Sequence, residues 1–261
     1  MTERPSLQFA AHGVRLAVTS DTHDVLDAAL SYLPPLRTSI DSGPIEKTFH
    51  VGSHDTDGTR VWSLVEGDEV LRSSARLPHV LNALEWEVHR FLAERAPDRI
   101  FVHAGAVEWR GRAIVVPGRS FSGKSTLVAA FLRAGCTYLS DEYAILDASG
   151  RCHAHPRPLS LRVEGRVERH TVQELGGRLA PAPLPVGAIV VTRYRPGARW
   201  EPNRLSPGQA LMSLLRNTIA IRSRSREALG ALSASVAGAD AYRSVRGNTD
   251  DVVASLLSQC S

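Results

Sequence analysis

The sequence predicts an α/β protein built from two parts, and three observations support this. An apolar run, residues 113–117, leads into a glycine-containing loop, and a helical pattern begins directly after that loop. Further upstream, residues 14–19, 47–51 and 60–65 alternate between apolar and polar types, as half-buried strands do. A chain of 261 residues, of which 43% are hydrophobic, can bury a sizeable core, and its length suits one large or two modest domains.

Residues 1–97 are expected to form the first part, a small α/β domain that acts as a cap or binds a partner. Its strands are accompanied by a helix over residues 25–33 and a helix over residues 78–94. The second helix carries an apolar stripe at helical spacing, made of Val80, Leu81, Leu84, Val88, Phe91 and Leu92. The histidines of this part lack metal-ligand spacing and are expected to be ordinary surface or core residues; they are His12, His23, His50, His54, His79 and His89.

Residues 98–261 are expected to form the second part, an α/β layer of strands and helices around the glycine-containing loop. Residues 101–109 and 113–117 predict a hairpin whose second strand delivers the loop. The pattern then predicts a helix over residues 126–133 and a short strand over residues 136–139. The later elements are a strand over residues 187–192 and helices over residues 207–218, 226–237 and 248–257, and Ser206 is expected to cap the first of these helices.

Gly118, Gly123, Lys124 and Ser125 match the phosphate-loop pattern of Gly, four free positions and then Gly-Lys-Ser/Thr. A loop that wraps a polyphosphate turns its backbone N–H groups inward, which requires glycine where the peptide approaches closely or takes a positive φ. Lys124 is then expected to lie against the β- and γ-phosphates, and Ser125 to offer a hydroxyl to Mg²⁺ beside the positive helix N-terminus. The predicted cofactors are ATP and Mg²⁺, and the predicted nucleotide-binding residues are Gly118, Arg119, Ser120, Phe121, Ser122, Gly123, Lys124, Ser125 and Thr126. The alternative is a turn that binds no ligand.

An acidic pair, Asp141 and Glu142, follows the short strand after the loop helix. Nucleotide enzymes place a carboxylate at such a position to hold Mg²⁺, directly or through water, or to take a proton from the attacking group. The predicted metal ligands are therefore Ser125, Asp141 and Glu142. His103 lies on the strand beside the loop strand, where it suits acid–base work, and its alternative is a histidine held by a backbone hydrogen bond. The predicted catalytic residues are Asp141, His103 and Lys124.

Three stretches in this region carry a family resemblance. His103-Ala-Gly-Ala-Val-Glu108, the phosphate loop, and Gly135-Cys-Thr-Tyr-Leu-Ser-Asp141-Glu142 resemble the catalytic domain of HPr kinase/phosphorylase. They are still more similar to the shorter HPr-kinase-like proteins associated with ribosomal peptide modification, including lasso peptide precursor kinases. The match covers roughly residues 100–147.

The resemblance implies a phosphoenolpyruvate-carboxykinase-type P-loop kinase domain, preceded here by the small α/β domain. It also implies an enzyme that uses ATP and Mg²⁺ to phosphorylate a serine hydroxyl of a peptide or small protein. A cytoplasmic location is expected from the cysteine pattern. By the same resemblance Asp141 is the general base, and His103 assists near the transferring phosphoryl group. Lys124 and the loop amides hold the phosphates, and Ser125 binds Mg²⁺.

The chain also departs from the family pattern. HPr kinases carry two aspartates where this chain has Asp141 and Glu142, and a glutamate after the loop serine where this chain has Thr126. The stretch that is characteristic of HPr kinases after the acidic pair is not recognisable in residues 158–164. The phosphorolysis activity of that family is therefore not expected in this chain. Three arginines are candidates for stabilising charge on the γ-phosphoryl group, namely Arg162, Arg193 and Arg195.

Charge and composition limit the classes of partner that the chain is expected to bind. The net charge is +4, yet the basic residues are nearly all arginines spread along the chain, and only Lys47 and Lys124 are lysines. No aromatic residues interleave with the densest stretch, residues 222–226, so no nucleic-acid partner is expected. The arginine-rich loops 193–204 and 218–226 are expected either to form an acceptor channel or to be solvated surface. Three scattered cysteines indicate cytosolic thiols, and no apolar run approaches the roughly 20 residues of a membrane span.

Three alternatives to a serine kinase follow from the same residues. Residues 205–209 superficially match the Leu-Ser-Gly-Gly-Gln helix start of transporter-type ATPases, but no apolar strand ending in Asp-Glu comes after them. A kinase of a small-molecule hydroxyl is the runner-up. A non-catalytic module that binds nucleotide to regulate assembly is the second alternative, although mere binding needs neither His103 nor Asp141. The sequence sets no oligomeric state and is compatible with a homo-oligomer.

Overall fold

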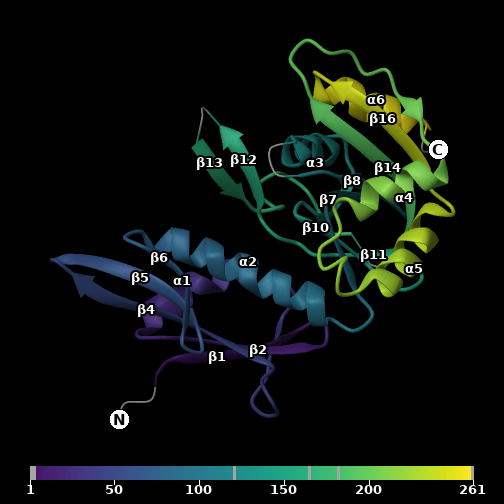
Figure 1. Ribbon diagram of the computed structural model, residues 1–261. Helices are drawn as coiled ribbons and strands as arrows, with labels where there is room; N and C mark the ends of the chain where they lie inside the picture. The colour runs from purple at the N-terminus through teal and green to yellow at the C-terminus, as the bar shows by residue number, and fades with distance from the viewer. Residues whose placement is uncertain (1–3, 120–121, 164–165, 181–182, 260–261) are drawn as a thin grey trace. The chain divides into compact units, whose positions relative to one another are not determined.

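The computed structural model describes residues 4–119, 122–163, 166–180 and 183–259 (Figure 1). These residues divide into two compact units, Met1–Pro97 and Asp98–Ser261. Helices and sheets occur in both units, so the predicted mixed α/β class is confirmed. Among the described residues, none of the helices has the length and apolar character that a membrane crossing requires.

The N-terminal unit contains a sheet with the strand order β3-β1-β2-β4-β5-β6. The strands are β1 (Ser6–Ala11), β2 (Val14–Ser20), β3 (Thr38–Ser39), β4 (Lys47–Thr56), β5 (Thr59–Glu66) and β6 (Glu69–Ser74). Tight turns connect the hairpins because His12-Gly13 and Asp57-Gly58 both take positive φ, which matches the twist of the flanking strands. The three predicted strands are confirmed within β2, β4 and β5, whereas β1, β3 and β6 were not predicted.

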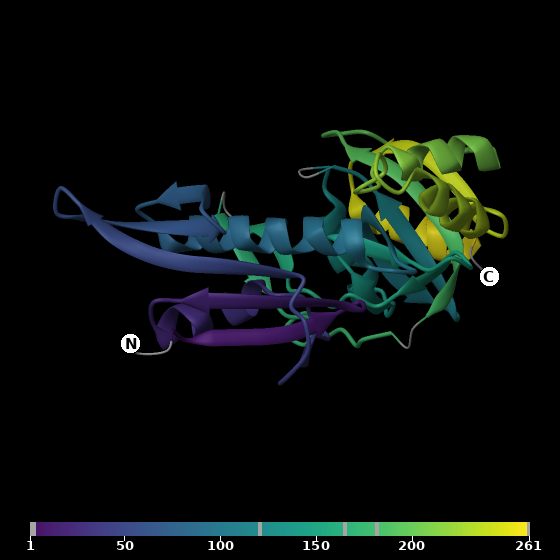
Figure 2. The same ribbon diagram turned by 60° about the horizontal axis from the view of Figure 1, so that its bottom comes forward.

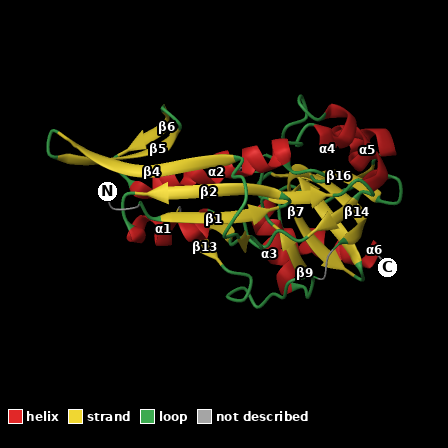
Figure 3. Cartoon of the chain, turned by 90° about the horizontal axis from the view of Figure 1, so that it is seen from below, coloured by secondary structure: helices red, strands yellow, loops and turns green. Residues whose placement is uncertain are grey.

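Helices α1 (His23–Ala29) and α2 (Leu77–Arg95) pack on this sheet. In Figure 3 the strands lie in front of α2, and Figure 2 shows α2 running along them. The predicted stripe of α2 is buried, as the sequence indicated. The predicted helix over residues 25–33 is shorter, because the chain tightens into a 3₁₀ turn, η1 (Leu30–Tyr32), ahead of two prolines.

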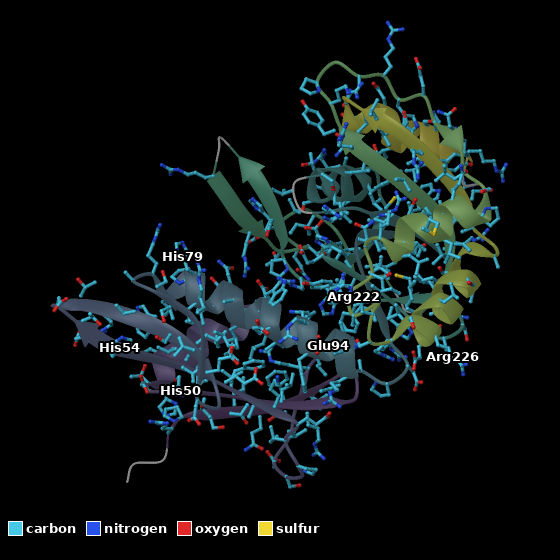
Figure 4. The ribbon with its side chains drawn as sticks, viewed as in Figure 1. His50, His54, His79, Glu94, Arg222 and Arg226 are labelled. Carbon is cyan, nitrogen blue, oxygen red and sulfur yellow. The ribbon has the colours of Figure 1, made fainter. Side chains whose placement is uncertain are left out.

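Three histidines of the N-terminal unit, His50, His79 and His89, form ordinary hydrogen bonds. His89 is fully buried and its Nδ1 lies 2.7 Å from the Glu85 carbonyl oxygen one helical turn earlier. His50 contacts the Thr19 hydroxyl at 3.0 Å and the Asp21 carboxylate at 3.3 Å. His50, His54 and His79 lie at separate places on the unit (Figure 4).

The C-terminal unit is built on a sheet with the strand order β11-β10-β7-β8-β14-β16-β15, to which β9 adds by pairing with β7. The strands are β7 (Ile100–Trp109), β8 (Arg112–Pro117), β9 (Thr137–Ser140), β10 (Tyr143–Leu146), β11 (Arg151–His153), β14 (Leu184–Tyr194), β15 (Asn203–Arg204) and β16 (Asp240–Arg246). β8, β14 and β16 are parallel neighbours, and β7 is antiparallel to β8. A separate hairpin, β12 (Leu159–Val163) and β13 (Arg166–His170), extends away from the sheet (Figure 1).

Helices cover both faces of this sheet. α3 (Lys124–Arg133) and α6 (Thr249–Gln259) share one core cluster with residues of β7, β8 and β14, including Val116, Phe131 and Val190. α4 (Pro207–Leu215) and α5 (Ser225–Val236) share the other cluster, which includes Val115 and Ile189. Neighbouring residues of one strand thus enter opposite cores, as the period of two in a strand requires.

Two details of α4 follow from its sequence. Ser206 caps its N-terminus in a capping box with Gln209, so the predicted cap at Ser206 is confirmed. The helix ends at Leu215 and not at Thr218 as predicted, because the chain turns there to pair with β7. The His103 amide donates to the Asn217 carbonyl oxygen at 2.7 Å, and the Ile219 amide donates to the Phe101 carbonyl oxygen at 2.9 Å.

Candidate active site at the phosphate loop

The glycine-containing loop follows β8 directly and ends at the first residue of α3. The Gly118 amide donates to the His103 carbonyl oxygen at 3.1 Å, so the loop begins as a continuation of the β7–β8 pairing. Gly123 takes φ +87° and ψ 20° immediately before Lys124, which opens the helix. Two of the predicted nucleotide-binding residues, Ser120 and Phe121, lie outside the described residues.

Each glycine of the motif is required for a different reason. At Gly118 a Cβ would lie 2.7 Å from the Ser122 hydroxyl oxygen, so the loop folds back on a position without room for a side chain. At Gly123 the left-handed backbone favours glycine, and a Cβ there would collide with the guanidinium of Arg246. The first helical bond runs from the Leu127 amide to the Gly123 carbonyl oxygen. The amides of the three residues before Leu127 therefore have no carbonyl partner inside the helix, as an anion-binding helix terminus requires.

β7 brings the other predicted residues to this loop. It pairs with β8 on one side and with β9 and β10 on the other, and Asp141 and Glu142 occupy the interruption between β9 and β10. The Ala104 amide donates to the Glu142 carbonyl oxygen at 3.2 Å, which holds the acidic pair against the middle of β7. Next to it, Gly105 lets α3 approach closely, since a Cβ at that position would lie 2.6 Å from Cγ2 of Val128.

Asp141 is the most perturbed carboxyl of the site. Its side chain is 3% exposed, and it accepts hydrogen bonds from the Ser125 hydroxyl and the Ser160 amide. Burial raises the pKa of Asp141 to about 6, with a further increase from Glu142, whereas the bond from Ser125 and the charge of Lys124 act in the opposite direction. Its Oδ1 atom is buried and has no hydrogen-bond partner among the described residues.

Lys124 lies in the same buried environment. It is 7% exposed, and its Nζ donates to the Arg119 carbonyl oxygen at 3.1 Å, within the loop. Burial lowers the pKa of Lys124, while the charges of Glu142 and Asp141 raise it. The buried ammonium group of Lys124 thus lies near two carboxylates and the amides of a helix N-terminus. In this buried place the charge of Lys124 attracts an anionic ligand more strongly than it would in water.

His103 and Glu142 form a pair beside Asp141. Nε2 of His103 lies 2.9 Å from Oε1 of Glu142, and Tyr143 is the β10 residue opposite His103. Burial acts to raise the pKa of Glu142, but the hydrogen bond and charge of His103 together with Arg157 and Lys124 outweigh it, and the net pKa is lowered. Glu142 is therefore an ionised partner of His103 in this structure.

The oxygen atoms around Asp141 fit a magnesium ion. Mg²⁺ is commonly bound through one or two carboxylates, with substrate phosphates and water completing the octahedron. The paired Ser125 hydroxyl and Asp141 carboxylate are hard oxygen ligands, and Oδ1 of Asp141 is a buried acceptor with nothing described bound to it. Glu142, the third predicted ligand, is hydrogen-bonded to His103. Among the described residues as a whole, this site included, no group of three or more His, Cys, Asp or Glu side chains has the geometry of a metal site.

Arg246, which was not predicted from the sequence, is 1% exposed and donates from Nη2 to the Gly123 carbonyl oxygen at 2.6 Å. Arg246 is the last residue of β16, a strand that was not predicted, and its place at the carboxyl end of a strand parallel to β14 points to the edge of the sheet where the loop lies. Of the predicted arginines, Arg193 and Arg195 are exposed near this edge, and Arg162 lies on β12. Arg222 lies in the turn before α5 and Arg226 in the first turn of α5, and both are exposed (Figure 4).

Comparison with known proteins adds no assignment, because no family model matches the chain and no curated protein is found to match it. A functional conclusion therefore depends on the residues and geometry around the loop. The structure brings together five predicted site residues, namely His103, Lys124, Ser125, Asp141 and Glu142.

Proposed function

We propose that this chain is an ATP- and Mg²⁺-dependent kinase that transfers the γ-phosphoryl group to a serine hydroxyl of a peptide or small protein. The C-terminal unit is the catalytic domain in this proposal, with an HPr-kinase-like, phosphoenolpyruvate-carboxykinase-type P-loop fold. The N-terminal unit is proposed to act as a cap or to bind a partner. A precursor of a ribosomal peptide is an example of the acceptor, and the cytoplasm is the proposed location.

The observation that carries the proposal is the setting of Asp141. A carboxyl with a pKa of about 6 is largely ionised at neutral pH and still basic enough to take a proton as a bond forms. Its partners are the helix-start residues Lys124, which a phosphate loop aims at the β- and γ-phosphates, and Ser125, which it aims at Mg²⁺. A module that only binds nucleotide can use a carboxylate here to hold Mg²⁺, but it has no need for one that accepts a proton near neutral pH.

Each residue then has a defined role. Lys124 and the loop amides bind the phosphates and balance charge on the phosphoryl oxygens. Asp141 accepts the proton of the serine hydroxyl as that oxygen bonds to the γ-phosphorus and the bond from the γ-phosphorus to the bridging oxygen breaks, so that ADP leaves. His103, fixed by Glu142, orients groups at the transferring phosphoryl. Ser125 and Asp141 would hold Mg²⁺, which when bound neutralises charge on the β- and γ-phosphate oxygens.

The test is transfer of label from γ-labelled ATP to candidate acceptors by the purified full chain. Peptides with serine are offered beside free small-molecule alcohols, and Lys124→Ala and Asp141→Asn serve as inactive variants. Label on a peptide that both variants fail to produce supports the proposal. Label only on a free alcohol would replace it with the small-molecule kinase, and ATP binding without transfer or hydrolysis would replace it with the regulatory module.

A further inference from the structure

Three connections leave the C-terminal sheet at the edge where parallel strands β8, β14 and β16 end. The phosphate loop follows β8, residues 195–202 follow β14, and Gly247 and Asn248 follow β16 before α6 begins. In open α/β sheets, ligands bind outside the carboxyl ends of the strands. The phosphate loop accounts for only one of these three connections.

A pocket of about 730 Å³ lies between the other two connections and α6. Small-molecule pockets usually measure about 300–1,000 Å³, so this one is large enough for a ligand of metabolite size. The two connections touch: the Arg195 amide donates to the Arg246 carbonyl oxygen at 2.8 Å, and a Cβ on Gly247 would lie 2.5 Å from the Ala198 carbonyl oxygen. The close approach leaves no room for a side chain at position 247.

Arg246 connects this pocket to the phosphate loop. Its Nη2 donates to the Gly123 carbonyl oxygen, and its Cζ lies 5.9 Å from the ring centroid of Tyr194, which lines the pocket. A Cβ on Gly123 would also lie 3.6 Å from Cβ of Tyr194. The pocket therefore begins beside the glycine that precedes Lys124, next to the phosphates of any ligand held by the loop.

The lining suits the uncharged part of a nucleotide. The side chain of Tyr194 is 52% exposed, and Trp200 supplies a second aromatic wall that packs on the core. Aromatic faces of this kind stack on nucleic-acid bases. Asn248 and Asp251 add an amide and a carboxylate, which can bond sugar hydroxyls and base N–H groups. The Asp251 carboxylate disfavours a phosphate here, although exposed Arg199 also belongs to the lining.

We propose that this pocket holds the nucleoside part of the triphosphate, with its base on Tyr194 and its phosphates in the loop at Gly118–Ser125. The inference rests on the proposed function, since it requires a triphosphate in the loop. In this proposal, contacts from the connections after β14 and β16 make the protein bind a nucleotide more tightly than a polyphosphate without a nucleoside.

Isothermal titration of the full chain with Mg-ATP and with inorganic tripolyphosphate and Mg²⁺ tests the pocket. The wild-type protein is expected to bind ATP at least about tenfold more tightly than tripolyphosphate, the factor that stacking of one base supplies. Tyr194→Ala is expected to weaken ATP binding about tenfold and to leave tripolyphosphate binding unchanged. Tyr194→Phe keeps the ring and is expected to keep the ATP affinity, and Trp86→Ala, at an aromatic 57% exposed in the N-terminal unit, is the control.

The outcomes separate the two proposals. Equal wild-type affinities for ATP and tripolyphosphate, or unchanged ATP binding by Tyr194→Ala, would overturn the nucleoside pocket and leave the phosphate loop in place. Equal losses for both ligands in Tyr194→Ala would also overturn it, because Tyr194 would then act only by supporting the loop. Absence of binding by either ligand to the wild-type protein would contradict the proposed function itself, and the pocket with it.

Discussion

Nη2 of Arg246 donates a hydrogen bond of 2.6 Å to the carbonyl oxygen of Gly123, a residue 123 positions earlier in the chain. The same carbonyl accepts the first bond of α3 from the Leu127 amide at 3.2 Å. Arg246 therefore fixes the left-handed residue from which the loop enters the helix. Burial lowers the pKa of Arg246, so the guanidinium is held in place at a cost in solvation.

Arg246→Met is expected to weaken ATP binding about tenfold, which corresponds to the hydrogen bond of a charged donor. The free energy of unfolding is expected to change by less than about 1 kcal/mol, because loss of the bond is offset by removal of a desolvated charge. Titration with ATP and chemical denaturation measure the two effects. Arg243→Met on the same strand is the matched control, since Arg243 is exposed and bonds Ser213. Equal ATP affinities in the two variants would contradict a role in the loop.

The raised pKa of Asp141 predicts the pH dependence of phosphoryl transfer. A general base must be ionised to accept the serine proton, and kcat/KM for Mg-ATP reports the free enzyme, in which Asp141 holds no metal, so kcat/KM is expected to rise with pH through an apparent pKa of about 6 and then to level off. Steady-state rates across this range, with Mg²⁺ supplied in equal amount to ATP, provide the measurement. A rate that is flat from about pH 5 to pH 8 would assign proton removal to another group or to the solvent.

The same pKa predicts how stability changes with pH. The folded state keeps the Asp141 proton up to about pH 6, whereas the unfolded carboxyl releases it near 3.8, so the folded state binds more protons between these values. The free energy of unfolding therefore falls as pH rises through this window. The Asp141→Asn variant has no carboxyl that can lose stability in this way. The free energy of unfolding of Asp141→Asn minus that of the wild type is therefore expected to increase by up to about 3 kcal/mol between about pH 4 and pH 7. Denaturant titrations at both pH values measure it, and a constant difference would mean that the Asp141 pKa is unshifted.

The His103–Glu142 pair predicts a rate effect without a binding effect. Glu142→Gln replaces the ionised partner of His103 by a neutral amide, so kcat is expected to fall about tenfold while ATP affinity is unchanged. Single-turnover rates and ATP titrations separate the two quantities. His153 and Asp147 form a pair with the same 2.9 Å separation on another part of the sheet, which makes Asp147→Asn the matched control. A loss of ATP affinity in Glu142→Gln equal to its loss of rate would place Glu142 in ligand binding.

Local sequence patterns were sufficient to predict the phosphate-loop motif and the elements on either side of it. The loop between β8 and α3, the hairpin that delivers it, and the cap of α4 at Ser206 each depend on residues within a few positions of one another. The acidic pair was also located correctly after a short strand, because Asp141 and Glu142 directly follow β9.

Long-range relationships could not be predicted in the same way. The bond between Glu142 and His103 depends on a register that sets Tyr143 opposite His103, and no local pattern specifies that register. β16 was not predicted, because the residues of this strand that are buried are not the ones that their hydrophobic character would indicate. Its buried last residue, Arg246, bonds a backbone carbonyl, and a backbone partner leaves no trace in residue types.

Helix α3 approaches strand β7 closely at Gly105. A Cβ at this position would lie 2.6 Å from Cγ2 of Val128, so Gly105→Ala is expected to overpack the contact and to lower the free energy of unfolding by about 1–3 kcal/mol. ATP binding is expected to weaken too, because Lys124 opens the helix that is displaced. Val128→Ala removes the obstructing methyl group and leaves a small cavity.

The double variant Gly105→Ala/Val128→Ala distinguishes this contact from a general effect of alanine in a strand. If the two side chains compete for one space, the double variant loses less stability than the sum of the single variants, and its ATP affinity returns toward that of the wild type. Denaturation and ATP titration of all four proteins complete the cycle. Additive losses would mean that Gly105 acts through its own backbone, and the position of Lys124 against Asp141 would then have to be set by the loop and Arg246 alone.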